Sequence, residues 1–142
     1  MSATKEHELI VAMVARYMRK RGYDLVALDC SLSWLFGDAF RLPPAIVLHR
    51  PDVLGVRKEA PLVCIGEAKT RGDIRSARTR HQLKDFAEAK AGDAGMRCEV
   101  IVGIPADCKQ ALKQVLSSLG VPPERITVIP VPRPLLPERD EQ

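Results

Sequence analysis

The apolar run Leu62-Val63-Cys64-Ile65 is the feature that most constrains how this chain folds. No polar residue alternates within it, so it predicts a strand over residues 61–69 that is buried on both faces. Residues 98–104 hold a second run of the same kind. Strands of this type belong to sheets that are covered by helices. The chain is therefore expected to form a sheet flanked by helices.

The periodicity of the remaining segments predicts the order of the elements. We expect a helix over 5–21, strands over 23–30, 52–56 and 61–69, a helix over 73–91, a strand over 98–104, a helix over 106–119 and a strand over 125–131. Residues 31–44 form either a short helix or a packed loop. The early strands follow one another closely, which favours antiparallel pairing, whereas the later strands alternate with helices, which favours parallel pairing. The expected fold class is α/β, with a mixed central sheet flanked by helices.

Length and charge limit the organisation of the chain. Its 142 residues fit one domain, expected over 1–131, and the proline-rich, charged residues 132–142 are expected to form an extended tail. A net charge of +4 suits a polyanionic partner without proving one. No signal peptide, membrane span or glycine-rich phosphate loop is recognisable, so we expect a cytoplasmic protein with no membrane partner and no nucleotide cofactor. The spacing of the cysteines and histidines does not predict a zinc site.

Two carboxylates and one amine are the strongest candidates for chemistry. Side chains two positions apart in a strand share a face, so Glu67 and Lys69 point the same way. A hairpin between 51–56 and 61–69 brings Asp52 near Glu67. These two carboxylates and the backbone carbonyl of Ala68 are the oxygen ligands that Mg²⁺ prefers, with Mn²⁺ as a substitute. Lys69 would orient the attacking water or stabilise the transition state. Singly, each is a common turn or strand-end residue; together they favour a functional site.

The stretch Pro51-Asp52…Glu67-Ala68-Lys69 resembles the PD-(D/E)xK nuclease superfamily, and the similarity covers about residues 5–104. The resemblance implies a restriction-endonuclease-like αβββαβ core, with Asp52 and Glu67 as metal ligands and Lys69 as the catalytic lysine. It also implies a metal-dependent DNA endonuclease with a Mg²⁺-activated water, acting in DNA repair, recombination or mobile-element defence. The alternatives are a catalytically inactive nucleic-acid-binding or assembly subunit of the same fold, and a small α/β enzyme or regulatory domain that binds a small molecule.

The resemblance further suggests an acidic residue in the first helix. Glu6 shares the face of Ile10, Met13 and Tyr17, so it is expected to point toward the sheet as a third metal-site carboxylate. A glutamate that only favours the helix dipole explains Glu6 equally well. Glu8 is expected to face solvent. Holliday-junction resolvases begin similarly, although Gly22 lies further along here than in their pattern.

The second long helix supplies the remaining candidates. Gln82, with Phe86 in place of a tyrosine, resembles the Gln-x-x-x-Tyr element of several superfamily branches, and an ordinary polar helix residue is the alternative. Four residues, Arg71, Arg75, Arg78 and His81, are candidate contacts to DNA phosphates, although a basic helix face can simply be solvated. A homodimer is expected because so small a chain covers little duplex. Ile104 and residues 125–131 are candidates for its interface.

Overall fold

The computed structural model describes residues 4–37, 40–46, 48–92 and 95–137. Its helices and strands are α1 (Lys5–Lys20), β1 (Asp24–Leu28), β2 (Val53–Val56), β3 (Val63–Ala68), α2 (Ala77–Ala87), β4 (Lys90–Ala91), β5 (Met96–Arg97), β6 (Glu99–Pro105), α3 (Lys109–Ser118) and β7 (Thr127–Val131). Short 3-10 turns occupy η1 (Ser33–Phe36), η2 (Ala106–Cys108), η3 (Pro123–Arg125) and η4 (Arg133–Leu135).

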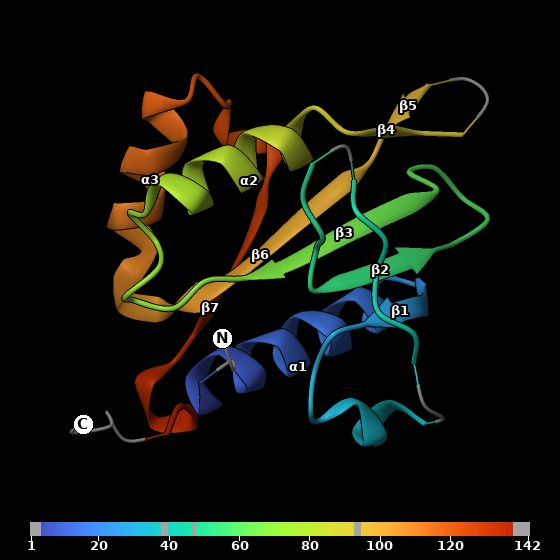
Figure 1. Cartoon of the computed structure of the whole chain (residues 1–142), viewed down its shortest axis with the longest axis horizontal. Coiled ribbons are helices and arrows are strands. Elements are labelled where there is room, and N and C mark those ends of the chain that lie inside the picture. Colours follow the sequence, from blue (N-terminus) through green and yellow to red (C-terminus); the bar gives the residue numbers. More distant parts are fainter. Residues whose placement is uncertain (1–3, 38–39, 47, 93–94, 138–142) are drawn as a thin grey trace.

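The main sheet has five strands in the order β1-β2-β3-β6-β7 (Figure 1). The strands β1, β2 and β3 pair antiparallel, whereas β6 pairs parallel with both β3 and β7. The parallel pairs are those that α2 and α3 connect, as expected for strands joined by a helical crossover. The predicted α/β class and the mixed sheet are thus confirmed.

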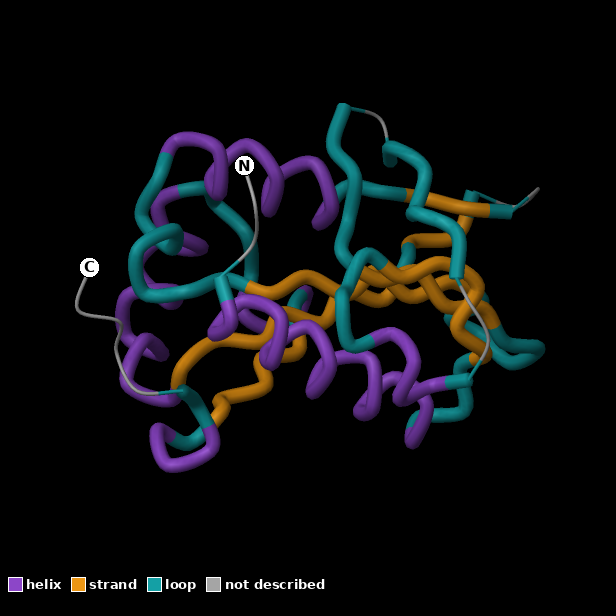
Figure 2. Tube along the Cα trace, turned by 60° about the horizontal axis from the view of Figure 1, so that its bottom comes forward, coloured by secondary structure: helices purple, strands orange, loops and turns teal. Residues whose placement is uncertain are grey.

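Helices cover the two faces of this sheet. The helix α1 lies along one face, and α2 and α3 lie on the other (Figures 1 and 2). Two buried clusters correspond to these layers. The cluster on the α1 side includes Ile10, Val14, Met18, Val53 and Ile101. The cluster on the opposite side includes Ile65, Leu83, Phe86, Val100 and Leu112. Alternation along β3 and β6 sends successive side chains to opposite clusters, which explains their continuous apolar runs.

Two glycines let α1 approach the sheet closely. A Cβ atom on Gly66 of β3 would lie 2.7 Å from Met18 Sδ and 2.8 Å from Val14 Cγ1. A Cβ atom on Gly103 of β6 would lie 2.5 Å from Val14 Cγ2 and 2.8 Å from Ile10 Cγ2. All four distances are shorter than van der Waals contact, so a larger residue at either position would prevent α1 from packing this close to the sheet.

Several predicted boundaries differ from the structure. The helix expected over 73–91 begins only at Ala77, because Ser76 caps it by accepting a hydrogen bond from Thr79 N at 3.1 Å. It ends at Ala87, and the chain then forms the β4–β5 hairpin, which the sequence pattern did not predict. Residues 33–36 adopt the short-helix alternative.

Three expectations about the surface can also be compared with the structure. Ile104 is fully buried, so the prediction that it contributes to a dimer interface is wrong. Residues 133–135 form a 3-10 turn, and Arg133 Nη2 lies 3.0 Å from Asp107 Oδ2, so this part of the tail is not extended; residues 138–142 lie outside the described residues. None of the helices among the described residues is long and apolar enough to cross a membrane.

Candidate active site

Asp52 and Glu67 meet where the β2–β3 pair reaches the carboxyl end of β3. The register pairs Val53 with Gly66, which places Asp52 beside Glu67 on the neighbouring strand. The backbone N–H of Asp52 donates to Glu67 Oε1 at 3.1 Å. The backbone N–H of Ala68 donates to Asp52 Oδ2 at 2.8 Å. These two bonds fix both carboxylates against the backbone of the opposite strand, as the hairpin prediction required.

Lys69 and Gln82 lie beside these two carboxylates on the α2 side of the sheet. We call the group of Asp52, Glu67, Lys69 and Gln82 the corner. Lys69 Nζ lies 3.2 Å from Glu67 Oε2 and also donates a hydrogen bond to Gln82 Oε1. Glu67, Lys69 and Gln82 are only 3%, 6% and 3% exposed. The side chain of Asp52 is 14% exposed, so the corner is most accessible from the Asp52 side. The structure thus brings together four of the predicted residues.

The electrostatics of the corner centre on Glu67. Burial raises the pKa of the Glu67 carboxyl well above its usual range, and the charge of Asp52 raises this pKa further. Lys69 opposes the shift through its charge and its hydrogen bond, but the net direction remains upward. A positive charge placed beside Asp52 and Glu67 would lower the pKa of Glu67 and stabilise its ionised form.

His7 is the residue of α1 that reaches the corner. His7 Nε2 lies 3.4 Å from Asp52 Oδ2, and His7 Nδ1 is buried without a hydrogen-bond partner in the part of the chain that the structure describes. Burial alone lowers the pKa of His7, but the hydrogen bond and the charge of Asp52 outweigh it, so this pKa is raised. The sequence reasoning missed His7. The signal was available, because residue 7 has the same helical phase as the buried Val11, Val14 and Met18.

The helical argument that favoured Glu6 over Glu8 is wrong. Glu6 is half-buried, and within the described ranges it makes no hydrogen bond or ion pair with Asp52, Glu67 or Lys69. Glu8 does not face free solvent, because Glu8 Oε2 accepts a hydrogen bond from Ser31 N at 2.9 Å. The buried stripe of α1 is turned relative to the predicted one, and Glu6 lies beside it rather than on it.

The predicted phosphate contacts fall into two groups. Arg71 pairs with Asp107, which Arg133 also contacts, and these two guanidinium groups lower the pKa of the Asp107 carboxyl to about 2. Arg75, Arg78 and His81 are exposed, and the described residues provide no ion-pair partner for them. Arg75 precedes α2, so only Arg78 and His81 share a helical face.

The donors at the corner suit a hard divalent cation. The carboxylates of Asp52 and Glu67 and the carbonyl of Ala68 are oxygen ligands, and Mg²⁺ needs few of these because it keeps several waters. Over the described parts of the chain, no three His, Cys, Asp or Glu side chains come together as a group that could hold a metal ion. Asp52 and Glu67 are therefore the two carboxylates that this corner could offer to a cation, and a cation beside them would favour the ionised form of Glu67.

No protein-family model, curated protein or solved structure matches this chain. The functional argument therefore depends on the fold and on the geometry of this corner.

Proposed function

We propose that this protein is a metal-dependent DNA endonuclease of the PD-(D/E)xK superfamily, with Mg²⁺ as its cofactor and Mn²⁺ as a substitute. In this proposal α1, β1–β3, α2 and β6 form the restriction-endonuclease-like αβββαβ core. The pairing of three antiparallel strands with a fourth, parallel strand beyond α2 supports that assignment.

The observation that carries the proposal is the contact between Asp52, Glu67 and Lys69. The two carboxylates come from neighbouring strands and are joined through the hydrogen bond from Asp52 N to Glu67 Oε1 at 3.1 Å. The amine lies 3.2 Å from Glu67 Oε2, at the same carboxyl end of β3. A lysine and two carboxylates are costly to bury together. In phosphodiester hydrolysis each of these three groups has a chemical role.

Each residue has a defined task in this mechanism. Asp52, Glu67 and the carbonyl of Ala68 would hold the divalent cation, which would supply Lewis-acid activation of a water and charge stabilisation at the phosphate. Lys69 donates from Nζ to the attacking water or to the phosphate oxygens. Gln82 keeps that amine in place through its hydrogen bond to Nζ. Cleavage leaves 5′-phosphate and 3′-hydroxyl ends.

The exposed basic residues beside the corner bind the DNA backbone in this proposal. Arg75, Arg78 and His81 contact phosphates, which sets the position of the duplex without reading its sequence. Arg71 contributes less, since Asp107 already pairs with it. The active form is a homodimer, so that two such corners act on one DNA molecule.

A cleavage panel tests the proposal. Supercoiled plasmid, linear duplex, single-stranded and branched DNA are incubated with Mg²⁺, with Mn²⁺ or with EDTA. The wild type is expected to cleave at least one of these with metal and none in EDTA. Lys69→Ala and Asp52→Asn should each lower the rate by about 10²–10³-fold. Lys58→Ala, which changes an exposed lysine in the turn at the other end of the β2–β3 hairpin, should leave the rate unchanged.

A different result would favour the binding-subunit alternative. If the wild type binds DNA but is as inert as Lys69→Ala on every substrate with either metal, the chain is a nucleic-acid-binding subunit of this fold. If it neither binds nor cleaves DNA, the proposal is wrong.

A further inference from the structure

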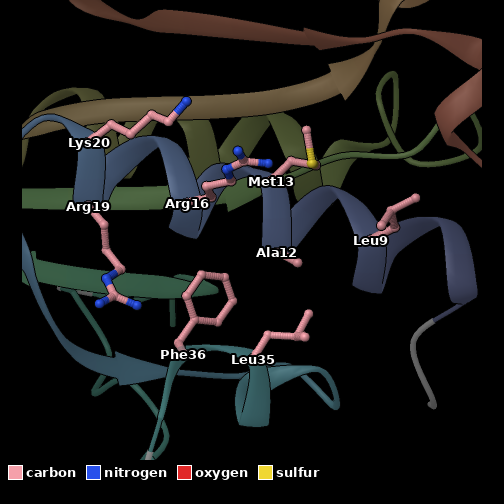
Figure 3. Close-up of a pocket in the computed structure, with 8 residues that line it drawn as sticks. All are labelled: Leu9, Ala12, Met13, Arg16, Arg19, Lys20, Leu35 and Phe36. Carbon is pink, nitrogen blue, oxygen red and sulfur yellow. The ribbon is translucent and has the colours of Figure 1, made fainter.

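A groove runs between α1 and η1, on a side of α1 that is not packed on the sheet (Figure 3). Its volume is about 540 Å³. One wall comes from α1 and the other from η1, as Figure 3 shows. The lining residues are Leu9, Ala12, Met13, Arg16, Arg19, Lys20, Leu35 and Phe36. The corner formed by Asp52, Glu67 and Lys69 contributes no residue to this lining.

The η1 wall presents large apolar side chains to solvent. Trp34 is 68% exposed and Leu35 is 54% exposed. Leu9, Met13 and Phe36 continue the apolar surface along the groove and are only half-buried. Adjacent exposed side chains of this size mark surfaces that a partner covers, because leaving them in water forfeits the free energy of burial.

Three cations line the same groove. Arg16, Arg19 and Lys20 are exposed, and among the described residues no carboxylate forms an ion pair with any of them. The Arg19 guanidinium instead lies 5.9 Å from the centre of the Phe36 ring. An apolar strip edged by these three cations is complementary to a segment with apolar anchors and acidic flanks. A second copy of this chain fits poorly, since a two-fold contact through the groove would bring the two sets of cations together.

We propose that the groove between α1 and η1 is a docking site for an acidic, amphipathic segment of a partner protein. Apolar side chains of the segment pack against Leu9, Met13 and Leu35, and its acidic residues pair with Arg16, Arg19 and Lys20. The site is independent of the proposed nuclease corner, so either can exist without the other.

The probe is a fluorescein-labelled helical peptide with leucines along one face and glutamates elsewhere, and its anisotropy reports binding. Trp34 is the only tryptophan of the chain and lies next to Leu35 on η1, so a change in its fluorescence is an additional sign of binding near this wall. The Arg16→Glu/Arg19→Glu double variant should weaken binding at least about tenfold, and so should Leu35→Gln. Lys113→Glu, an exposed position on α3, is the matched control and should stay within about twofold. Binding should also weaken as salt rises.

Several outcomes would overturn the proposal. Equal affinity for a counterpart peptide with lysines in place of the glutamates would show that charge plays no part. Unchanged affinity in Leu35→Gln would place the contact elsewhere. If the acidic peptide does not bind, a protein segment is not the occupant. The same conclusion holds if phosphatidylserine vesicles or single-stranded DNA bind in its place. A dimer that Leu35→Gln converts to a monomer would assign the groove to self-association.

Discussion

Glu67 is the residue on which the electrostatics of the candidate site depend most. Its carboxyl is 3% exposed, lies beside Asp52 and contacts the Lys69 amine at 3.2 Å. The pKa of Glu67 is raised because burial and the charge of Asp52 outweigh the effect of Lys69. Burial and the charge of Asp52 therefore oppose ionisation of this carboxyl in the folded protein. Ionisation of Glu67 therefore costs stability, and a divalent cation bound as proposed would offset that cost.

Glu67→Gln should therefore stabilise the metal-free protein at neutral pH. The carboxyl has a usual pKa of about 4.3 in an unfolded chain, and its pKa is higher in the folded state. Between these two pKa values the folded state binds more protons, so the free energy of unfolding falls as pH rises through that window. Glutamine does not titrate, so Glu67→Gln removes this decrease in the free energy of unfolding. Thermal melts in EDTA at about pH 5 and about pH 8 should show the variant gaining on the order of 3 °C over the wild type at the higher pH.

The control for this experiment is Glu124→Gln, which changes an exposed glutamate of η3. It should leave both melting temperatures within about 1 °C of the wild type. A variant at position 67 that is less stable than the wild type at both pH values would contradict the account, because it would show that the ionised Glu67–Lys69 pair is net stabilising.

The sequence was sufficient to place Asp52, Glu67 and Lys69 together, because strand alternation and a short hairpin leave little choice of geometry. It was not sufficient to identify which residue of α1 lies at this corner. A helix that is apolar at both residues 10–11 and residues 13–15 has a broad hydrophobic stripe, and its rotation is set by the sheet beneath it. Gly66 and Gly103 determine where Val14 sits, and that contact turns His7 rather than Glu6 toward Asp52.

At the scale of the elements, the contact of α1 with β3 and β6 holds the site in place. His7 belongs to the first turns of α1, and Glu67 lies one residue beyond Gly66 on β3. A shift of the helix away from the sheet would therefore separate His7 from Asp52. The depth of this packing depends on the absence of a Cβ atom in Gly66 and Gly103.

Gly103→Ala should destabilise the fold. A Cβ atom at this position meets Val14 Cγ2 at 2.5 Å and Ile10 Cγ2 at 2.8 Å, so α1 must move or its side chains must leave their rotamers. Overpacking of this kind costs about 1–3 kcal/mol, which urea denaturation would measure. Gly72→Ala is the matched control, because a Cβ atom there meets nothing within 4 Å. Equal stability of the two variants would show that the helix is not held against the glycines.

The predicted boundaries failed where local hydrogen bonds compete with helical periodicity. The Thr70 hydroxyl donates to Asp73 Oδ2 at 3.0 Å, and the Thr79 hydroxyl donates to Asp73 O at 2.7 Å. These bonds hold residues 70–76 as turns and delay the start of α2. The buried strands β3 and β6 were predicted well, because a continuous apolar run has few alternatives to the centre of a sheet.

At the scale of the whole molecule, exposed positive charge lies on α2, the helix that carries Gln82, and on the turn before it. Arg75→Ala and Arg78→Ala should each weaken DNA binding by a similar factor for every sequence. Each should also reduce the slope of the logarithm of the binding constant against the logarithm of the salt concentration by about 1. Arg71→Ala should have a smaller effect, because Asp107 already pairs with Arg71. Fluorescence anisotropy with a labelled duplex in Ca²⁺, at about 50 to about 200 mM salt, measures both quantities.

Lys58→Ala is the control for DNA binding, since Lys58 is an exposed lysine at the far end of the β2–β3 hairpin. If Lys58→Ala weakens binding as much as Arg75→Ala and Arg78→Ala do, net charge alone explains the affinity. The face that carries Arg75 and Arg78 would then have no special role.

Metal binding at Asp52 and Glu67 is the central claim, and calorimetric titration with Mn²⁺ tests it most directly because it needs no knowledge of the DNA substrate. The wild type is expected to bind Mn²⁺ saturably, and Mg²⁺ should compete for the same site. Asp52→Asn should abolish the binding, because it removes one of the two carboxylates, whereas Glu124→Gln should leave it unchanged. Absence of saturable binding in the wild type, or binding that survives intact in Asp52→Asn, would contradict the account.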